Sequence, residues 1–196
     1  MSDVTPTLLQ IDLQNLFYEA RNKNQRLDLE KIWEFFGQRE SEYMTDALVY
    51  MIRGTDFDST KFEAKLKSIG YSLRIKTALK VTKNSRTYYR QTNHDVAIAV
   101  DCLDRIDQFQ KWILMSGDGD FADVCKYLRN KGKKVEIWSF KDCYNPQLEQ
   151  YADKMYFIGE DFYLKKSRVR VFGFNNDEID TDRTKSQLPT TKVVGL

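Results

Sequence analysis

Short apolar runs alternate along this chain with longer segments in which apolar residues recur every three or four positions. The short runs are typical of buried strands, and the segments with helical spacing are typical of amphipathic helices. Strands are predicted over Leu8–Asp12, Ala47–Ile52, Tyr71–Val81, Trp112–Ser116, Lys134–Ser139 and Met155–Ile158. Because helical segments separate most of these strands, parallel pairing through crossover helices is expected. The pattern therefore predicts a three-layer α/β/α sandwich around a mainly parallel central sheet.

The predicted helices carry apolar stripes, and several of them end at a glycine. Stripes are expected at Ile32, Trp33 and Phe36, at Phe62, Leu66 and Ile69, at Val96, Ala99, Val100 and Leu103 between Asn93 and Asp107, and at Phe121, Val124, Cys125 and Leu128, with further helices from about Leu16 and over Pro146–Tyr151. Gly37, Gly70 and Gly132 follow three of these segments, where glycine is a common terminator. A polar turn near Lys83, followed by Thr87–Arg90, predicts a small hairpin.

Composition indicates one folded domain with an extension. The 196 residues include 12 Phe, 11 Tyr and 3 Trp, enough for one substantial core, and the net charge is only +2. Residues 1–164 are predicted to form the domain, and residues 165–196 to form a basic and polar C-terminal extension. No apolar run approaches the roughly 18 residues that cross a bilayer, and the N-terminal residues do not resemble a signal peptide. A cytoplasmic protein without membrane contact is expected, and the sequence leaves open whether it forms a homo-oligomer.

The cysteine and histidine content argues against two common kinds of site. Cys102, Cys125 and Cys143 are too few and too scattered for a disulfide framework. His94 is the single histidine, and there is no Cys-x-x-Cys pair, so a zinc site with nitrogen and sulfur ligands is not expected. Any bound metal would therefore have oxygen ligands.

Ser116–Phe121, with the sequence Ser-Gly-Asp-Gly-Asp-Phe, places two carboxylates at a predicted strand-to-helix turn. In open α/β sheets, ligands bind at the carboxyl ends of the strands. Gly117 and Gly119 are expected to let the backbone bend and to keep the space above Asp118 and Asp120 free of side chains. The alternative is ordinary turn chemistry in which Asp120 caps the following helix.

Two further acids are expected at the same edge of the sheet. Asp12 ends the first predicted strand, with Asn15 within one turn of it, and Asp95 lies in the first turn of a helix that starts near Asn93. Asp95 reaches this edge if an antiparallel strand or a loop returns the chain there. Asp101, Asp104 and Asp107 are expected on the solvated side of that helix, with a supporting role for Asp101 left open.

Convergence of four carboxylates requires a cation. Two carboxylates about 4 Å apart repel each other by roughly 4 kcal/mol at an effective dielectric constant of about 20. Oxygen ligands favour Mg²⁺ or Mn²⁺, and an ion of this kind is suited to phosphodiester hydrolysis. Asp12, Asp95, Asp118 and Asp120 are therefore the candidate catalytic metal ligands.

The segment from Tyr71 to His94 contains basic and aromatic residues and no acidic one. Basic side chains neutralise phosphates and aromatic rings stack on unpaired bases, which suits single-stranded nucleic acid. The alternative is a solvated hairpin whose lysines discourage pairing between sheet edges. The candidate nucleic-acid contacts are Arg74, Lys76, Lys80, Lys83, Arg86, Tyr88, Tyr89 and Arg90.

The motifs together resemble a known family. Ile11-Asp12-Leu-Gln-Asn15, His94-Asp95-Val-Ala-Ile-Ala-Val-Asp101, Leu114-Met-Ser-Gly-Asp-Gly-Asp-Phe121 and Leu128-Arg-Asn-Lys-Gly-Lys-Lys-Val135 resemble the NYN branch of PIN-like nucleases, close to the LabA-like proteins. The resemblance covers about residues 7–160. It implies a PIN-like Rossmannoid sandwich, a divalent metal and endoribonuclease activity on single-stranded or structured RNA. It also implies metal-binding roles for Asp12, Asp95, Asp118 and Asp120 and supporting roles for Asn15 and Ser116.

The chain departs from this family pattern immediately before Asp95. The family often has Lys-Gly there, whereas this sequence has Thr92, Asn93 and His94. His94 or Arg90 is a candidate replacement for the missing lysine. The departure keeps open a non-catalytic RNA-binding module of the same fold. A phosphatase of the haloacid dehalogenase type is disfavoured, because such enzymes usually have Asp-x-Asp where this chain has Asp12-Leu-Gln-Asn15.

Overall fold

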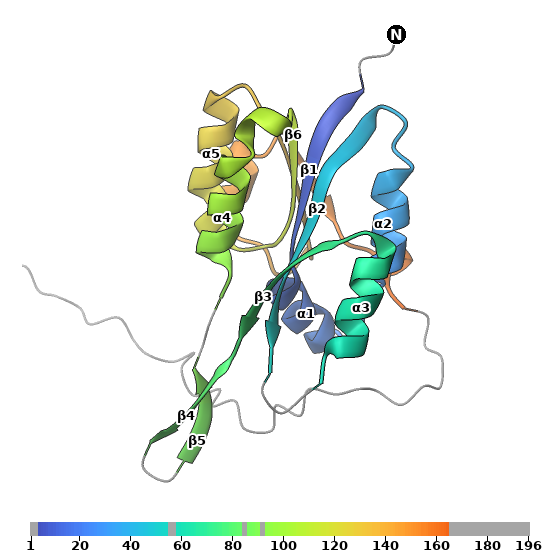
Figure 1. Cartoon of the computed structure of the whole chain (residues 1–196). Coiled ribbons are helices and arrows are strands. Elements are labelled where there is room, and N and C mark those ends of the chain that lie inside the picture. Colours follow the sequence, from blue (N-terminus) through green and yellow to red (C-terminus); the bar gives the residue numbers. More distant parts are fainter. Residues whose placement is uncertain (1–3, 55–57, 84–85, 91–92, 165–196) are drawn as a thin grey trace, which may run out of the picture.

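A parallel sheet of six strands forms the centre of the molecule in the computed structural model, which describes residues 4–54, 58–83, 86–90 and 93–164 (Figure 1). The strand order is β3-β2-β1-β6-β7-β8, and every neighbouring pair is parallel. The strands are β1 Thr5–Asp12, β2 Glu42–Arg53, β3 Ser72–Thr77, β6 Lys111–Met115, β7 Lys134–Ser139 and β8 Lys154–Phe157. The arrangement confirms the predicted parallel sheet.

Helices cover both faces of the sheet (Figure 1). One face packs against α1 Leu13–Asn22, α2 Leu29–Gly37 and α3 Thr60–Ile69, and the other against α4 Asp95–Asp104, α5 Ala122–Asn130 and α6 Gln147–Tyr151. Side chains alternate along β1, so Leu9 and Ile11 enter the first core and Leu8 enters the second. Short 3₁₀ turns η1 Ile106–Gln108, η2 Gly119–Phe121 and η3 Glu160–Phe162 complete the described elements. The predicted three-layer sandwich is thus confirmed.

A hairpin outside the main sheet replaces the end of one predicted strand. The prediction of a single strand over Tyr71–Val81 is wrong, because β3 ends at Thr77 and β4 Leu79–Lys83 pairs antiparallel with β5 Arg86–Arg90. This hairpin projects beyond the carboxyl ends of the parallel strands (Figure 1). It carries the chain outward and back, so that α4 begins at the carboxyl edge.

The apolar stripe predicted for α4 is rotated away from the core, whereas the stripe predicted for α3 loses only Phe62, because Leu66 is buried and Ile69 packs against the core. Val96 and Val100 of α4 are 74% and 58% exposed, whereas Ile98 and Cys102 are buried against the sheet. Ile98 and Cys102 are four residues apart and share the helix face that packs against the sheet, with Ala97 beside them. In α3, Phe62 is exposed, while the neighbouring carboxylate of Glu63 is buried and accepts hydrogen bonds from Arg53.

Of the described helices, none has the length and apolar character needed to cross a membrane. The predicted extension over residues 165–196 lies outside the described residues.

Candidate metal centre

Four aspartates from three segments meet at the carboxyl edge of the sheet, and we call them the acid cluster. Asp95 lies at the start of α4, Asp118 and Asp120 follow β6, and Asp12 ends β1. Carboxylate oxygens of Asp95, Asp118 and Asp120 all lie within 4.8 Å of one another. The negative charges of Asp95 and Asp118 also act on Asp12. The structure therefore brings three of the predicted acids, Asp95, Asp118 and Asp120, within reach of one ion and places Asp12 close enough for two of them to act on its charge.

Asp12 is the buried member of the acid cluster, with 4% of its surface exposed. Its carboxylate accepts hydrogen bonds from the backbone N–H of Asn15, over 3.2 Å, and from Ser116 Oγ, also over 3.2 Å. Burial raises the pKa of Asp12 to about 6, and the charges of Asp95 and Asp118 act in the same direction. The chain thus keeps a carboxylate where ionisation is unfavourable, which is common at functional sites.

Asn15 and Ser116 tie the two turns of the site together. Asn15 Oδ1 accepts a hydrogen bond from the Gly117 N–H at 3.0 Å, and Ser116 Oγ accepts one from the Asp118 N–H at 3.2 Å. Ser116 is completely buried. Their positions suit the supporting roles expected from the sequence, because each links the end of β1 to the turn after β6.

Asp118, rather than Asp120, caps the turn after β6. Asp118 Oδ1 accepts a hydrogen bond from the Asp120 N–H at 3.0 Å, and Asp118 is the N-cap of η2. The alternative interpretation of Asp120 as an N-cap is therefore wrong. The Asp120 side chain is exposed and keeps its oxygens available to a ligand.

The two glycines of this turn are required by packing rather than by an open space above the acids. Neither has a positive φ angle. A Cβ atom on Gly117 would lie 2.5 Å from Ser139 Oγ and would overlap the Cys143 carbonyl oxygen, and one on Gly119 would overlap the Asn145 side chain. The Asn145 N–H donates to the Gly117 carbonyl at 2.9 Å. The predicted reason for these glycines is wrong, since the loop after β7 occupies the space that they leave.

No lysine or arginine whose side chain the structure describes forms an ion pair with the acid cluster. Burial raises the pKa of Asp95, and the charges of Asp118 and Asp120 raise it further. Carboxylates held this close favour a cation, and an all-oxygen donor set fits Mg²⁺ or Mn²⁺. The residues present are therefore compatible with a divalent metal.

Asp101 lies on the same helix as Asp95 but has a different environment. It accepts hydrogen bonds from Arg74 Nε at 2.8 Å, Tyr50 Oη at 2.9 Å and Arg105 Nη1 at 3.2 Å. Burial acts to raise the pKa of Asp101, but these partners outweigh it and lower the pKa. The expectation that Asp101 decorates the solvated side of the helix is wrong, whereas Asp104 and Asp107 are exposed as expected. We call Asp101, Arg74, Arg105 and Tyr50 the Asp101 cluster.

A buried polar chain, which the sequence interpretation missed, leads from the core to the Asp101 cluster. Gln10 is fully buried; its Nε2 donates to Tyr50 Oη at 2.6 Å, and its Oε1 accepts from Trp112 Nε1 at 2.6 Å. Tyr50 then donates to Asp101. The available signal was a glutamine inside the apolar run of β1, because a buried amide needs hydrogen-bond partners.

The predicted nucleic-acid contacts differ in what their side chains do. Arg74 is engaged by Asp101, whereas Lys76 Nζ donates to the Asn93 carbonyl at 2.6 Å, and Asn93 Nδ2 donates in turn to Asp95. Lys76 is therefore linked to Asp95 through Asn93. Lys80 is exposed on β4. The side chains of Lys83, Arg86, Tyr88, Tyr89 and Arg90 lie outside the described part of the structure.

His94 does not supply the cation that the family pattern places before Asp95. The ring is 2% exposed, and Nε2 lies 2.9 Å from the Met51 carbonyl oxygen. Burial lowers the pKa of His94, so the ring is neutral near pH 7. A buried neutral imidazole cannot contact a phosphate, and the nearby charge is that of Lys76.

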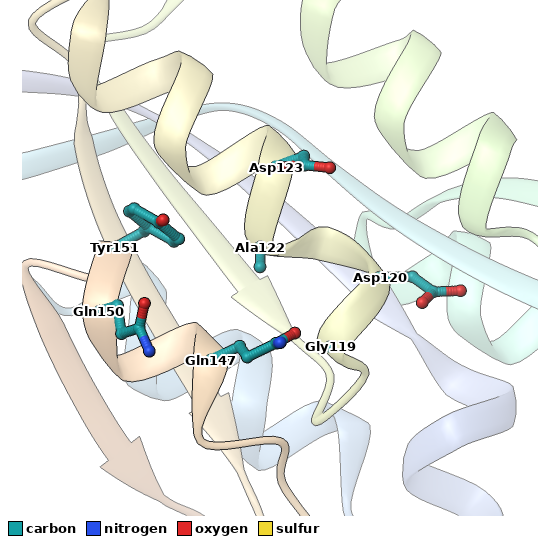
Figure 2. A pocket seen from close by; sticks show the side chains of 7 residues that line it. All are labelled: Gly119, Asp120, Ala122, Asp123, Gln147, Gln150 and Tyr151. Atoms are coloured by element: carbon teal, nitrogen blue, oxygen red, sulfur yellow. The ribbon is translucent and has the colours of Figure 1, made fainter. Parts of the chain in front are cut away.

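A cleft of about 390 Å³ opens beside Asp120, between η2, the start of α5 and α6 (Figure 2). Its walls include Asp123 of α5 and Gln147, Gln150 and Tyr151 of α6. The sequence pattern contained no signal for this feature, because the two walls are separated by more than twenty residues and by β7.

Comparisons with known proteins agree with this architecture. The family model of the NYN domain matches residues 6–159. The "Low amplitude and bright protein LabA" of Synechococcus elongatus is 26% identical over 146 residues, which cover 74% of this chain and 78% of that protein. A crystal structure of a protein of unknown function from Vibrio parahaemolyticus superposes with a TM-score of 0.73 at 23% identity, covering 84% of this chain and 99% of that one. The last likeness supports the fold alone.

Proposed function

The chain belongs to the NYN domain family, and from this membership and the acid cluster we propose that it is a metal-dependent endoribonuclease. The substrate would be single-stranded or structured RNA, and the cofactor Mg²⁺ or Mn²⁺. The observation that carries the proposal is the approach of Asp95, Asp118 and Asp120 to within 4.8 Å without a described cationic partner. An arrangement that is unfavourable by itself is expected where an external cation completes the site.

Each acid has a distinct task in this proposal. Asp95, Asp118 and Asp120 would hold the ion through their carboxylates, and buried Asp12 would complete the donor set beneath them. When bound, a divalent ion lowers the pKa of water and withdraws negative charge from a phosphate. The hydrogen bonds from Ser116 and from the Asn15 backbone hold Asp12 in one orientation, so the donor oxygens are preorganised before the ion arrives.

The basic residues of β3 and β4, which are Arg74, Lys76 and Lys80 and which we call the cationic flank, would bind the substrate backbone. Lys76 is placed beside Asp95 by its hydrogen bond to Asn93, which suits contact with a phosphate next to the acid cluster. The hairpin formed by β4 and β5 projects beyond this point and contributes Lys80 (Figure 1). Arg74 is a weaker candidate than the sequence suggested, because Asp101 already neutralises it. Phosphate contacts of this kind give salt-dependent binding without sequence preference.

A cleavage assay with purified protein tests the proposal. Labelled single-stranded RNA is incubated with Mn²⁺, with Mg²⁺ and with EDTA, for the wild type and for Asp95→Asn. Cleavage is expected only with metal, and it should be lost in Asp95→Asn. Asp104→Asn is the matched control, because Asp104 is an exposed carboxylate of the same helix. Cutting that persists in EDTA, or full activity of Asp95→Asn, contradicts the proposal.

A non-catalytic RNA-binding module is the second candidate, favoured by one observation. Directly before Asp95 the chain has Asn93 and the buried His94, where the family often has Lys-Gly, so the family's lysine is missing. This candidate predicts salt-sensitive RNA binding without turnover for several substrates and both metals. Clear cleavage by the purified protein eliminates it.

A further inference from the structure

Four features line up along the carboxyl edge of the sheet. In the strand order, Lys76 belongs to β3, Asp12 ends β1, Asp118 follows β6, and the cleft lies between the helices that follow β6 and β7. Neighbouring strands are about 4.8 Å apart. A chain that crosses this edge therefore meets a cation first, the acid cluster next, and the cleft within about one strand spacing beyond it.

The cleft differs chemically from the cationic flank. Gln147 and Gln150 provide amide groups, Tyr151 provides a half-buried ring, and Ala122 lies between the two walls (Figure 2). Gln147 extends toward Gly119, on the turn that carries Asp120 (Figure 2). The amides can each donate and accept a hydrogen bond, and the ring offers a flat apolar surface.

Charge argues against a phosphate in this cleft. Asp120 and Asp123 are among the residues that line it, and no lysine or arginine of the described chain does so. Two cations lie behind the lining residues: Lys126 Nζ is 5.8 Å from the centre of the Tyr151 ring, and Arg129 Nη1 donates to the Gln150 backbone carbonyl at 3.3 Å. Carboxylates repel a phosphate but accept hydrogen bonds from an amino group, so the lining suits a neutral group with N–H donors.

We propose that the cleft is a subsite for an unpaired nucleobase that carries an exocyclic amino group, adjacent to the phosphate at the acid cluster. This inference rests on the proposed function, since it takes the substrate to be RNA. Tyr151 stacks on the base, and Gln147 contacts its edge. Aromatic stacking and amide or carboxylate contacts are the usual means of reading unpaired bases. The volume of about 390 Å³ is within the usual range of small-molecule sites, about 300–1,000 Å³.

The consequence is a base preference at one position of the substrate. Adenine, cytosine and guanine carry the amino group and uracil does not, so uracil is the disfavoured base. A good edge contact discriminates between bases by roughly tenfold. The cationic flank, by contrast, is expected to contact only the backbone.

Binding without turnover tests the subsite. Uridine heptamers carrying one 2-aminopurine at each position in turn are mixed with the protein in EDTA, and anisotropy and 2-aminopurine emission are both recorded. Tyr151→Leu retains an apolar side chain against the core while removing the ring, and Gln147→Ala removes the amide. Tyr43→Leu and Gln108→Ala are matched controls, because both residues are exposed at the opposite, amino edge of the sheet.

The expected result is quenched emission at one position of the heptamer, with binding about tenfold tighter than that of all-uridine RNA. Tyr151→Leu should lose the quenching and Gln147→Ala the base preference, and both controls should retain them. If RNA binds but Tyr151→Leu quenches like the wild type, the subsite is refuted while the RNA proposal stands. If anisotropy shows no binding of any heptamer, RNA recognition itself fails, and the subsite with it.

Discussion

Two carboxylates on one helix, Asp95 and Asp101 of α4, have opposite electrostatic environments. Asp95, at the start of α4, faces Asp118 and Asp120, and its pKa is raised by burial and by those charges. Asp101, almost two turns further along, is surrounded by Arg74, Arg105 and Tyr50, which lower its pKa. The Asp101 cluster contains its own arginines, whereas no lysine or arginine whose side chain is described forms an ion pair with the acid cluster. The comparison shows that an acidic residue indicates a ligand site only where the fold places no basic side chain against it.

The largest expected difference between the acid cluster and the Asp101 cluster is in the rate of RNA cleavage. Asp118→Asn is expected to reduce metal-dependent RNA cleavage by about 100-fold or more, because losing even an indirect contact to a metal site costs 10- to 100-fold. Asp101→Asn should change the rate by less than about threefold. Single-turnover rates with labelled RNA measure both. Equal losses in the two variants would remove the distinction between the clusters.

The free energy of unfolding should depend more on Asp101 than on Asp118. Asp101→Ala removes the carboxylate to which Arg74 and the buried Tyr50 hydroxyl donate, while Arg105 keeps its contacts with Asp46 and with the backbone carbonyl of residue 101. The free energy of unfolding is expected to fall by about 2 kcal/mol, allowing for the partial exposure of Arg74. Asp118→Asn should leave stability unchanged or raise it, since it removes repulsion and asparagine still caps a turn. Urea unfolding in EDTA provides the comparison. A stable Asp101→Ala variant would argue against compensation within the Asp101 cluster.

The pH dependence of stability should have opposite signs at the two groups. The folded-state pKa of Asp12, about 6, lies above its ordinary value of 3.8, so the folded protein binds the extra proton and loses stability as the pH rises from about 4 to 6. Asp12→Asn should remove this loss and gain up to about 2 kcal/mol above pH 7 but little at pH 4. The lowered pKa of Asp101 stabilises the fold above its unfolded pKa, and that contribution is lost in acid.

Unfolding curves of the wild type and Asp12→Asn at pH 4 to 8, without divalent metal, measure this difference. Asp104→Asn is the control, because its exposed carboxylate belongs to neither cluster. A gain for Asp12→Asn that is the same at every pH would contradict the assignment to ionisation.

The smallest expected effect concerns two basic residues on one face of β3. Lys76→Ala should weaken RNA binding a few-fold and reduce the slope of log affinity against log salt by about 0.7, the value for one phosphate contact on a single strand. Arg74→Ala should reduce this slope less, because Asp101 already neutralises Arg74. Titrations at several salt concentrations measure both slopes, and a larger change for Arg74→Ala would reverse the proposed assignment.

The sequence was most informative about features that depend on residues close together along the chain. Alternating apolar runs predicted the parallel sheet, and the placement of Asp12 and Asp118 at strand ends predicted their meeting, because parallel strands end at one edge. It was least informative about helix rotation, since the stripe at Val96 and Val100 had the spacing of a core face yet is exposed. Periodicity shows that a face exists, but the packing partner decides which face is buried.

The sequence by itself determined the order of strands and helices, and it predicted which four acids lie near the carboxyl edge and that any metal there has oxygen ligands. Only the tertiary structure decided that Asp101 is compensated, that loop packing requires Gly117 and Gly119, that Lys76 lies beside Asp95 and that a cleft opens next to Asp120. These facts depend on contacts between segments distant along the chain. Pattern and spacing report local geometry, whereas the compensation of a charge depends on every group that the fold brings near it.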